Sequence, residues 1–285
     1  MKFSLKQALS FCFSDKEFAQ KMLIGCGFLI LSMLINNIID ILNNVPKNIT
    51  VIVVALFLAV VSIISTLIPY GYEVENSHLR LIQNEITLCD WKNKLQKLKY
   101  GFLSCFIPCL SWGLVMILIG FIFGFGAGFL HSLLLKITQG YLINIYLAFA
   151  FIALFFILLF TILIVEASRL SYITDLKFKS FFNLKAIKKI MFENFRKYVN
   201  YIGNIIILGF IQIAVLFVLA FVVNILAQFI AVVLSAAFTL DDVSKVIANI
   251  LYVLTFSPVI MYFYFVYSDL KAQFLKLTLQ DSDER

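Results

Sequence analysis

The sequence predicts an all-α protein, a polytopic membrane helix bundle with about six transmembrane helices. Composition is the first reason, because 62% of the 285 residues are hydrophobic and only 14% are charged, whereas a soluble domain carries about 25% charged residues. The second reason is that six intervals of 18 to 43 residues contain no charged residue, and about 20 apolar residues cross a bilayer as a helix. These intervals are continuously apolar, which excludes the alternating strands of a membrane barrel.

The uneven distribution of Lys and Arg predicts the orientation. The N-terminal segment, the second and fourth connections and the C-terminal tail together carry 20 of the 23 basic residues, and each remaining connection carries one. Basic residues accumulate in cytoplasmic loops, so both termini and both long connections are expected in the cytoplasm. The net charge of +7 then reflects topology, and no nucleic-acid partner is expected.

The spans follow one another along a single integral membrane domain, 1–285. They are expected at 22–42, 49–70, 102–124, 141–165, 200–223 and 246–267, followed by a C-terminal tail, 271–285. They pair into three hairpins of the same orientation, which is consistent with three tandem units.

The fifth apolar interval is 43 residues long and would rise about 65 Å as a helix, which exceeds one crossing. Residues 224–238 are therefore expected to continue the fifth span and to bend over or pack at the outer surface. Whether they cross, re-enter or lie on the membrane stays open.

The two long connections, 71–101 and 168–198, carry apolar residues at helical spacing among many lysines. The stripe in the second connection consists of Leu184, Ile187, Met191, Phe195 and Tyr198. This pattern is typical of an amphipathic helix that lies on a membrane with its lysines towards anionic headgroups. The candidate lipid contacts are Lys185, Lys188, Lys189 and Arg196 in the second connection, and Lys92 and Lys94 in the first.

Several short motifs in the first half of the chain resemble a known family. They are Lys21-Met22-Leu23-Ile24-Gly25, Tyr70-Gly71-Tyr72 with Leu79-Arg80, Asn84-Glu85, Asp90-Trp91 and Tyr100-Gly101-Phe102. Together they resemble the prokaryotic membrane family called domain of unknown function 4013. The resemblance implies a polytopic protein in the inner membrane of a prokaryotic cell. It implies no activity, because the family has none assigned.

Three glycines, Gly120, Gly124 and Gly128, follow one another at four-residue spacing around the end of the third span. Small residues at this spacing let two membrane helices approach closely, so these glycines are candidate helix-packing positions. The alternative is a phosphate-binding loop, which requires a strand before it and a Lys-Ser/Thr pair after it. The sequence has neither.

Three polar residues in or beside the spans are candidates for function, namely Glu166, Gln212 and Asn224. Gln212 and Asn224 are expected to form hydrogen bonds between helices. Glu166 precedes Arg169 by three residues on the same helical face, so an ion pair is the simpler interpretation. A proton-coupling carboxylate is the alternative, favoured if Glu166 is buried.

The sequence contains no familiar catalytic, nucleotide-binding or metal-binding motif. Neither an enzyme nor a cofactor is therefore expected, and two functions remain. The first is a non-catalytic membrane scaffold or helper that packs with lipid, with partner membrane proteins or with further copies of itself. The second is a small-solute transporter or channel component, with helices broken at Pro108 and Pro258 beside a polar cavity.

Overall fold

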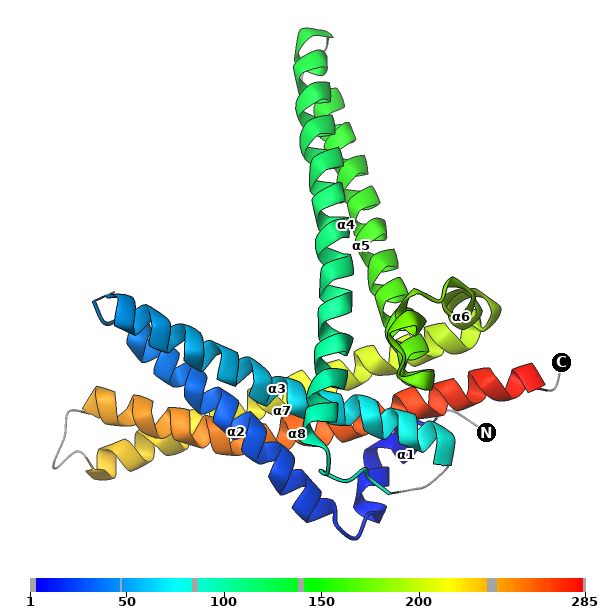
Figure 1. The fold of residues 1–285 in the computed structure, drawn as a ribbon. Coiled ribbons are helices and arrows are strands. Elements are labelled where there is room, and N and C mark those ends of the chain that lie inside the picture. The colour runs from blue at the N-terminus through cyan, green and yellow to red at the C-terminus, as the bar shows by residue number, and fades with distance from the viewer. Residues whose placement is uncertain (1–3, 47, 84–86, 138–140, 235–239, 284–285) are drawn as a thin grey trace. The chain divides into compact units, whose positions relative to one another are not determined.

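The computed structural model of the chain describes residues 4–46, 48–83, 87–137, 141–234 and 240–283. Within these ranges it contains helices and no strand (Figure 1), which confirms the predicted all-α class. The α-helices are α1 (Leu5–Ser10), α2 (Phe18–Asn43), α3 (Ile49–Gln83), α4 (Lys94–Ile137), α5 (Tyr141–Asp175), α6 (Leu184–Lys188), α7 (Phe195–Leu234) and α8 (Leu240–Asp283). The short elements are the 3-10 turns η1 (Phe11–Ser14) and η2 (Phe178–Phe182) and the π-helical turn η3 (Lys189–Glu193).

Five of the described helices contain segments long and apolar enough to cross a membrane. These segments are Phe18–Asn43, Ile49–Ile82, Phe151–Asp175, Phe195–Val233 and Ser244–Leu279. Each of the six predicted spans lies inside one long helix, from 22–42 in α2 to 246–267 in α8. The number of crossings and the three tandem units stay predictions.

The helices extend beyond the predicted spans, which corrects the prediction for the linkers. α3 runs without a break to Gln83, and α4 begins at Lys94, so both described parts of 71–101 include ends of long helices. The segment 84–86 lies outside the described residues. In 168–198, the short elements η2, α6 and η3 lie between the end of α5 and the start of α7. Continuing a helix keeps its backbone groups hydrogen-bonded, and these helix ends pack on protein.

The chain folds as two compact units. Unit 1 comprises Met1–Phe102 with Arg196–Arg285, and unit 2 comprises Leu103–Phe195. In unit 1, α2, α3 and α8 pack against one another, and α1 and η1 pack on α8. The apolar core of this packing includes Leu29 on α2, Tyr72 on α3 and Phe265 on α8.

Two glycines set the distance between α3 and the start of α4 in unit 1. A Cβ atom at Gly71 would overlap the carbonyl oxygen of Lys97, and a Cβ atom at Gly101 would overlap that of Leu67. The two backbones therefore touch where the helices cross. A residue with a side chain would force them apart.

Unit 2 is built around the end of α5, against which η2, α6 and η3 pack. Ser168 Oγ donates to the carbonyl oxygen of Phe181 (2.5 Å), and Ser171 Oγ donates to that of Ser180 (2.8 Å). The ring of Tyr172 stacks on the ring of Phe181, with centroids 4.2 Å apart. These contacts hold the chain after α5 against the helix that precedes it.

The ends of α7 and α8 differ from the sequence prediction. α7 is one continuous helix of 40 residues, so 224–234 extends the fifth span without a break; 235–238 lie outside the described residues. α8 continues past the sixth span, and Lys271, Phe274 and Leu275 are buried. The start of the predicted tail is therefore part of the core of unit 1, because its side chains find partners on other helices.

Candidate functional site

Four ion pairs with buried cations lie in unit 1, near the ends of several helices. The pairs are Lys21 with Asp15, Arg80 with Asp269, Lys97 with Glu75, and Lys271 with Glu73. None of the four cationic side chains is more than 9% exposed. A buried charge costs several kcal/mol unless it is paired, and here four cations face four anions. We call these eight residues the ion-pair core.

Arg80 on α3 binds Asp269 on α8. Arg80 Nε donates to Asp269 Oδ1, and Gln273 Nε2 donates to Oδ2 at 2.6 Å. The guanidinium of Arg80 also lies over the ring of Phe11, 4.2 Å from its centroid, which is a cation–π contact. The backbone N–H of Ser4 donates to Gln273 Oε1 at 2.9 Å. One network therefore joins the N-terminal segment, α3 and α8.

A second pair on the same two helices lies beside an amide network. Lys271 Nζ donates to Glu73 Oε1. Asn76 Nδ2 donates to Ser268 Oγ at 2.6 Å, and the backbone N–H of Cys89 donates to Asn76 Oδ1 at 2.9 Å. Asn76 therefore links α3 to α8 and to the segment that precedes α4.

Asp15 and Lys21 hold this segment to the start of α2. Lys21 Nζ donates to Asp15 Oδ2 at 3.0 Å and to the carbonyl oxygen of Leu88 at 2.8 Å. The backbone N–H groups of Leu88 and Glu17 also donate to Asp15. Burial alone would raise the pKa of Asp15, but these hydrogen bonds outweigh it and hold the pKa below its ordinary value. Trp91 Nε1 donates to the Lys21 carbonyl oxygen at 2.7 Å.

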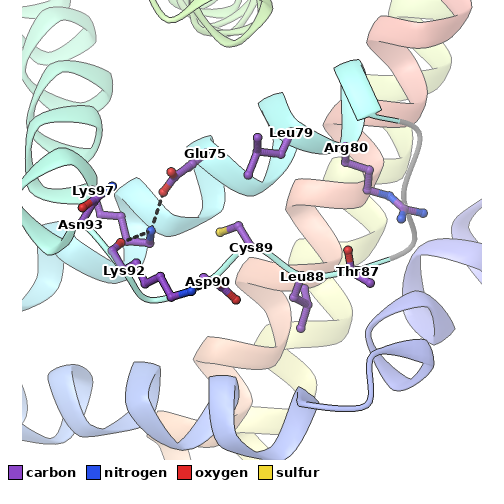
Figure 2. Close-up of a pocket in the computed structure, with 10 residues that line it drawn as sticks. All are labelled: Glu75, Leu79, Arg80, Thr87, Leu88, Cys89, Asp90, Lys92, Asn93 and Lys97. Atoms are coloured by element: carbon purple, nitrogen blue, oxygen red, sulfur yellow. Dashed lines mark hydrogen bonds and ion pairs between the residues drawn. The ribbon is translucent and has the colours of Figure 1, made fainter.

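A polar cavity of about 350 Å³ lies beside the ion pair of Lys97 and Glu75 (Figure 2). Lys97 Nζ donates to Glu75 Oε2 at 2.6 Å and to the carbonyl oxygen of Lys92 at 2.9 Å. Arg80 and Asp90 also line the cavity. Charges of both signs face this space, and the Lys97 ammonium group is already bound by protein oxygens.

The two cysteines next to the ion-pair core are packing residues. Burial raises the pKa of the Cys89 thiol to about 12 and that of the Cys12 thiol to about 11. Both therefore stay protonated at neutral pH, whereas the thiolate is the nucleophile and the metal ligand. Among the described residues, no group of three His, Cys, Asp or Glu side chains could hold a metal ion.

Most of the predicted lipid contacts lie on the surface. Five of them are exposed, namely Lys92, Lys94, Lys185, Lys188 and Arg196, and Lys189 is half-buried. Lys94 Nζ lies 5.8 Å from the ring centroid of Phe28. Whether these residues contact lipid stays a prediction.

The apolar stripe predicted beside the second group of lysines does not form one exposed face. Ile187, Met191 and Tyr198 are buried, whereas Leu184 and Phe195 are exposed. The π-helical turn η3 changes the helical register within the stripe, and α6 and η3 pack on α5. The prediction of a continuous membrane-facing stripe is therefore wrong. Other apolar side chains of unit 2 are exposed instead, namely Phe178, Phe182 and Phe192.

In the glycine series on α4, the two described positions, Gly120 and Gly128, have no described side chain packed against them. A Cβ atom at Gly120 or at Gly128 would meet no described atom within 4 Å. The surroundings of Gly124 lie outside the described residues. Helix packing at these glycines stays a prediction.

The three polar candidates of the spans have partners or surroundings of their own. Glu166 Oε2 pairs with Arg169 Nη1 at 3.2 Å on α5. Gln212 Oε1 accepts a hydrogen bond from the Tyr267 hydroxyl at 3.2 Å, which joins α7 to α8. Asn224 is exposed on α7. None of the three lines the cavity beside Lys97.

The ion-pair core is the feature that sequence reasoning missed. One signal for it was present, because Glu73, Asn76 and Arg80 stand at i, i+3 and i+7 and so share one face of α3. A polar stripe on a helix that continues an apolar span indicates a polar partner inside the protein. The stripe does not identify that partner.

No protein-family model, no curated protein and no solved structure matches this chain. The resemblance to the domain of unknown function 4013 therefore stays a prediction.

Proposed function

We propose that the chain is a non-catalytic membrane scaffold or helper, a multi-pass protein that packs with lipid and with partner membrane proteins. The observation that carries this proposal is the ion-pair core. Its four cations and four anions are paired with one another, so they hold helix ends together and leave no unpaired member for charge chemistry. The helices of unit 1 also present apolar side chains outward, as at Phe217 of α7, which is 74% exposed.

The transporter alternative has less support. A transport site is expected at the middle of the spans, where broken helices expose polar backbone groups. α4 and α8 instead pass through Pro108 and Pro258 as continuous helices. The cavity lined by Pro108 also has mainly apolar neighbours, such as Ile164 and Phe181.

The proposed lipid partner is an anionic headgroup at the basic surfaces. Lys185 and Lys188 are exposed next to Leu184, which is 78% exposed, and Phe182 is exposed nearby in the chain. Lysines beside exposed apolar side chains are typical of a segment at a membrane surface. Each such lysine contributes about 1 kcal/mol to binding at an anionic leaflet.

We expect both long connections to face the cytoplasm of a prokaryotic cell. In a chain whose native cysteines are replaced by alanine, Asn48→Cys should react with an impermeant thiol reagent added to intact cells. Lys94→Cys and Lys188→Cys should react only after the membrane has been opened. All three positions are exposed, so burial would not explain a difference. Labelling of Lys94→Cys from outside would reverse the proposed orientation.

Photo-crosslinking in native membranes tests the scaffold. A photoreactive residue in place of Phe217 should form an adduct with another membrane protein or with a second copy of the chain. Deleting the chain should then lower the amount or the assembly of that partner. The matched control is the same replacement at Leu208 on α7, which is fully buried and should give no intermolecular adduct. Adducts with lipid alone, together with solute flux through liposomes that contain the purified chain, would contradict the scaffold.

A further inference from the structure

A groove in unit 1 has the dimensions and the chemistry of a lipid site. It lies where α3 and the start of α4 cross, with a volume of about 420 Å³. Val60, Ile63 and Ile64 of α3 form one wall, and Leu95, Leu98 and Phe102 of α4 form the other. The crossing is held by the backbone contact at Gly71 and Gly101, so both walls belong to rigid helices.

Among the described residues, Lys99 is the only charged one that lines this groove. Lys99 is exposed on α4, and all the other lining residues are apolar. The groove therefore offers a cation at one place and hydrocarbon contact elsewhere. An amphiphile with an anionic head and an apolar chain has the complementary distribution.

The groove fits within one leaflet of a bilayer. On α3 its lining runs from Val60 to Leu67, a rise of about 10 Å along the helix, and the predicted second span ends shortly afterwards at Tyr70. Half of the hydrocarbon core is about 15 Å thick. An acyl chain that starts beside Lys99 and lies along Ile63 and Val60 would therefore stay within one leaflet.

We propose that this groove binds one anionic phospholipid, with its phosphate at Lys99 and an acyl chain between α3 and α4. The inference rests on the proposed function, because it requires the chain to lie in a bilayer. It adds a defined lipid position built from residues of unit 1, whereas Lys185 belongs to unit 2.

The test uses the purified full-length chain in detergent with an equimolar mixture of phosphatidylglycerol and phosphatidylcholine, and native mass spectrometry counts the bound lipids. Lys99→Gln should lower the preference for phosphatidylglycerol about fivefold, the ratio that corresponds to one lysine at a lipid headgroup. Ile63→Trp fills the groove and should lower the occupancy of both lipids. Lys16→Gln, at an exposed lysine on the N-terminal segment, is the matched control and should leave the preference unchanged.

Three results would overturn the proposal. They are an unchanged preference in Lys99→Gln, unchanged occupancy in Ile63→Trp, and displacement of the lipid by glycerol phosphate, which has a headgroup but no acyl chain. These outcomes are independent of the crosslinking at Phe217. If the lipid tests fail while Phe217 still crosslinks to a protein partner, the lipid site is wrong and the scaffold is supported. If Phe217 gives no such crosslink while the lipid tests succeed, the scaffold is wrong and the lipid site is supported.

Discussion

Gly71→Ala is expected to lower the free energy of unfolding by about 3 kcal/mol or more. Overpacking a core costs about 1–3 kcal/mol when side chains can move aside. Here the added methyl group would overlap the backbone carbonyl of Lys97, which cannot change rotamer. The helices would have to separate along the whole crossing, and Gly101→Ala should have the same effect at Leu67. Unfolding of the purified chain in mixed detergent micelles, titrated with dodecyl sulfate, measures the loss.

Gly27→Ala and Gly203→Ala are the matched controls. A Cβ atom at either position would meet nothing within 4 Å. Alanine is a better helix former than glycine by about 1 kcal/mol, so these variants should be neutral or slightly more stable than the parent. If Gly71→Ala unfolds at the same dodecyl sulfate fraction as Gly27→Ala, the backbones of α3 and α4 do not touch at the crossing.

Asp269→Ala is expected to destabilise the chain by about 3–5 kcal/mol, the usual cost of removing one partner from a buried ion pair. The variant leaves the Arg80 guanidinium buried without this carboxylate and also removes the acceptor of Gln273. The double variant Arg80→Met with Asp269→Leu should recover most of the loss, because it removes both charges. The same dodecyl sulfate titration measures both variants.

The ion pair between Lys92 and Asp90 is the control for this experiment. Its atoms lie 3.2 Å apart, but the Lys92 side chain is 86% exposed. An exposed pair contributes about 0–1 kcal/mol, so Lys92→Ala should change stability by no more than that. Equal effects of Asp269→Ala and Lys92→Ala would contradict the burial of the ion-pair core.

The long helices could be predicted because hydropathy is a local property. The charge-free intervals indicate where apolar helices lie, and each predicted span lies inside one long helix. The limits of the helices could not be predicted in the same way. A lysine or glutamate next to an apolar run reads as the end of a span, yet α3 continues past Glu73 to Gln83. Charged residues end a membrane crossing without ending a helix.

The ion-pair core depends on contacts that sequence spacing does not record. Arg80 and Asp269 are 189 residues apart, and Glu73 and Lys271 are 198 residues apart. A lysine beside an apolar stripe faces either a lipid phosphate or a protein carboxylate, and the local pattern is the same in both cases. Lys188 is exposed, whereas Lys97 is buried and paired with Glu75, and the sequence around each does not distinguish them. Likewise, the contact of Gly71 with the start of α4 depends on how two helices cross.

The separation of these partners along the chain has a consequence for synthesis. A ribosome adds about 5–20 residues per second, so Glu73 and Arg80 exist for roughly 10 to 40 seconds before Lys271 and Asp269 are made. During that time the first hairpin carries charges whose final partners do not yet exist. The end of α8 must then dock between elements already in place. A nascent chain halted before Asp269 would therefore hold Glu73 and Arg80 without Lys271 and Asp269, the residues that pair with them in the complete fold.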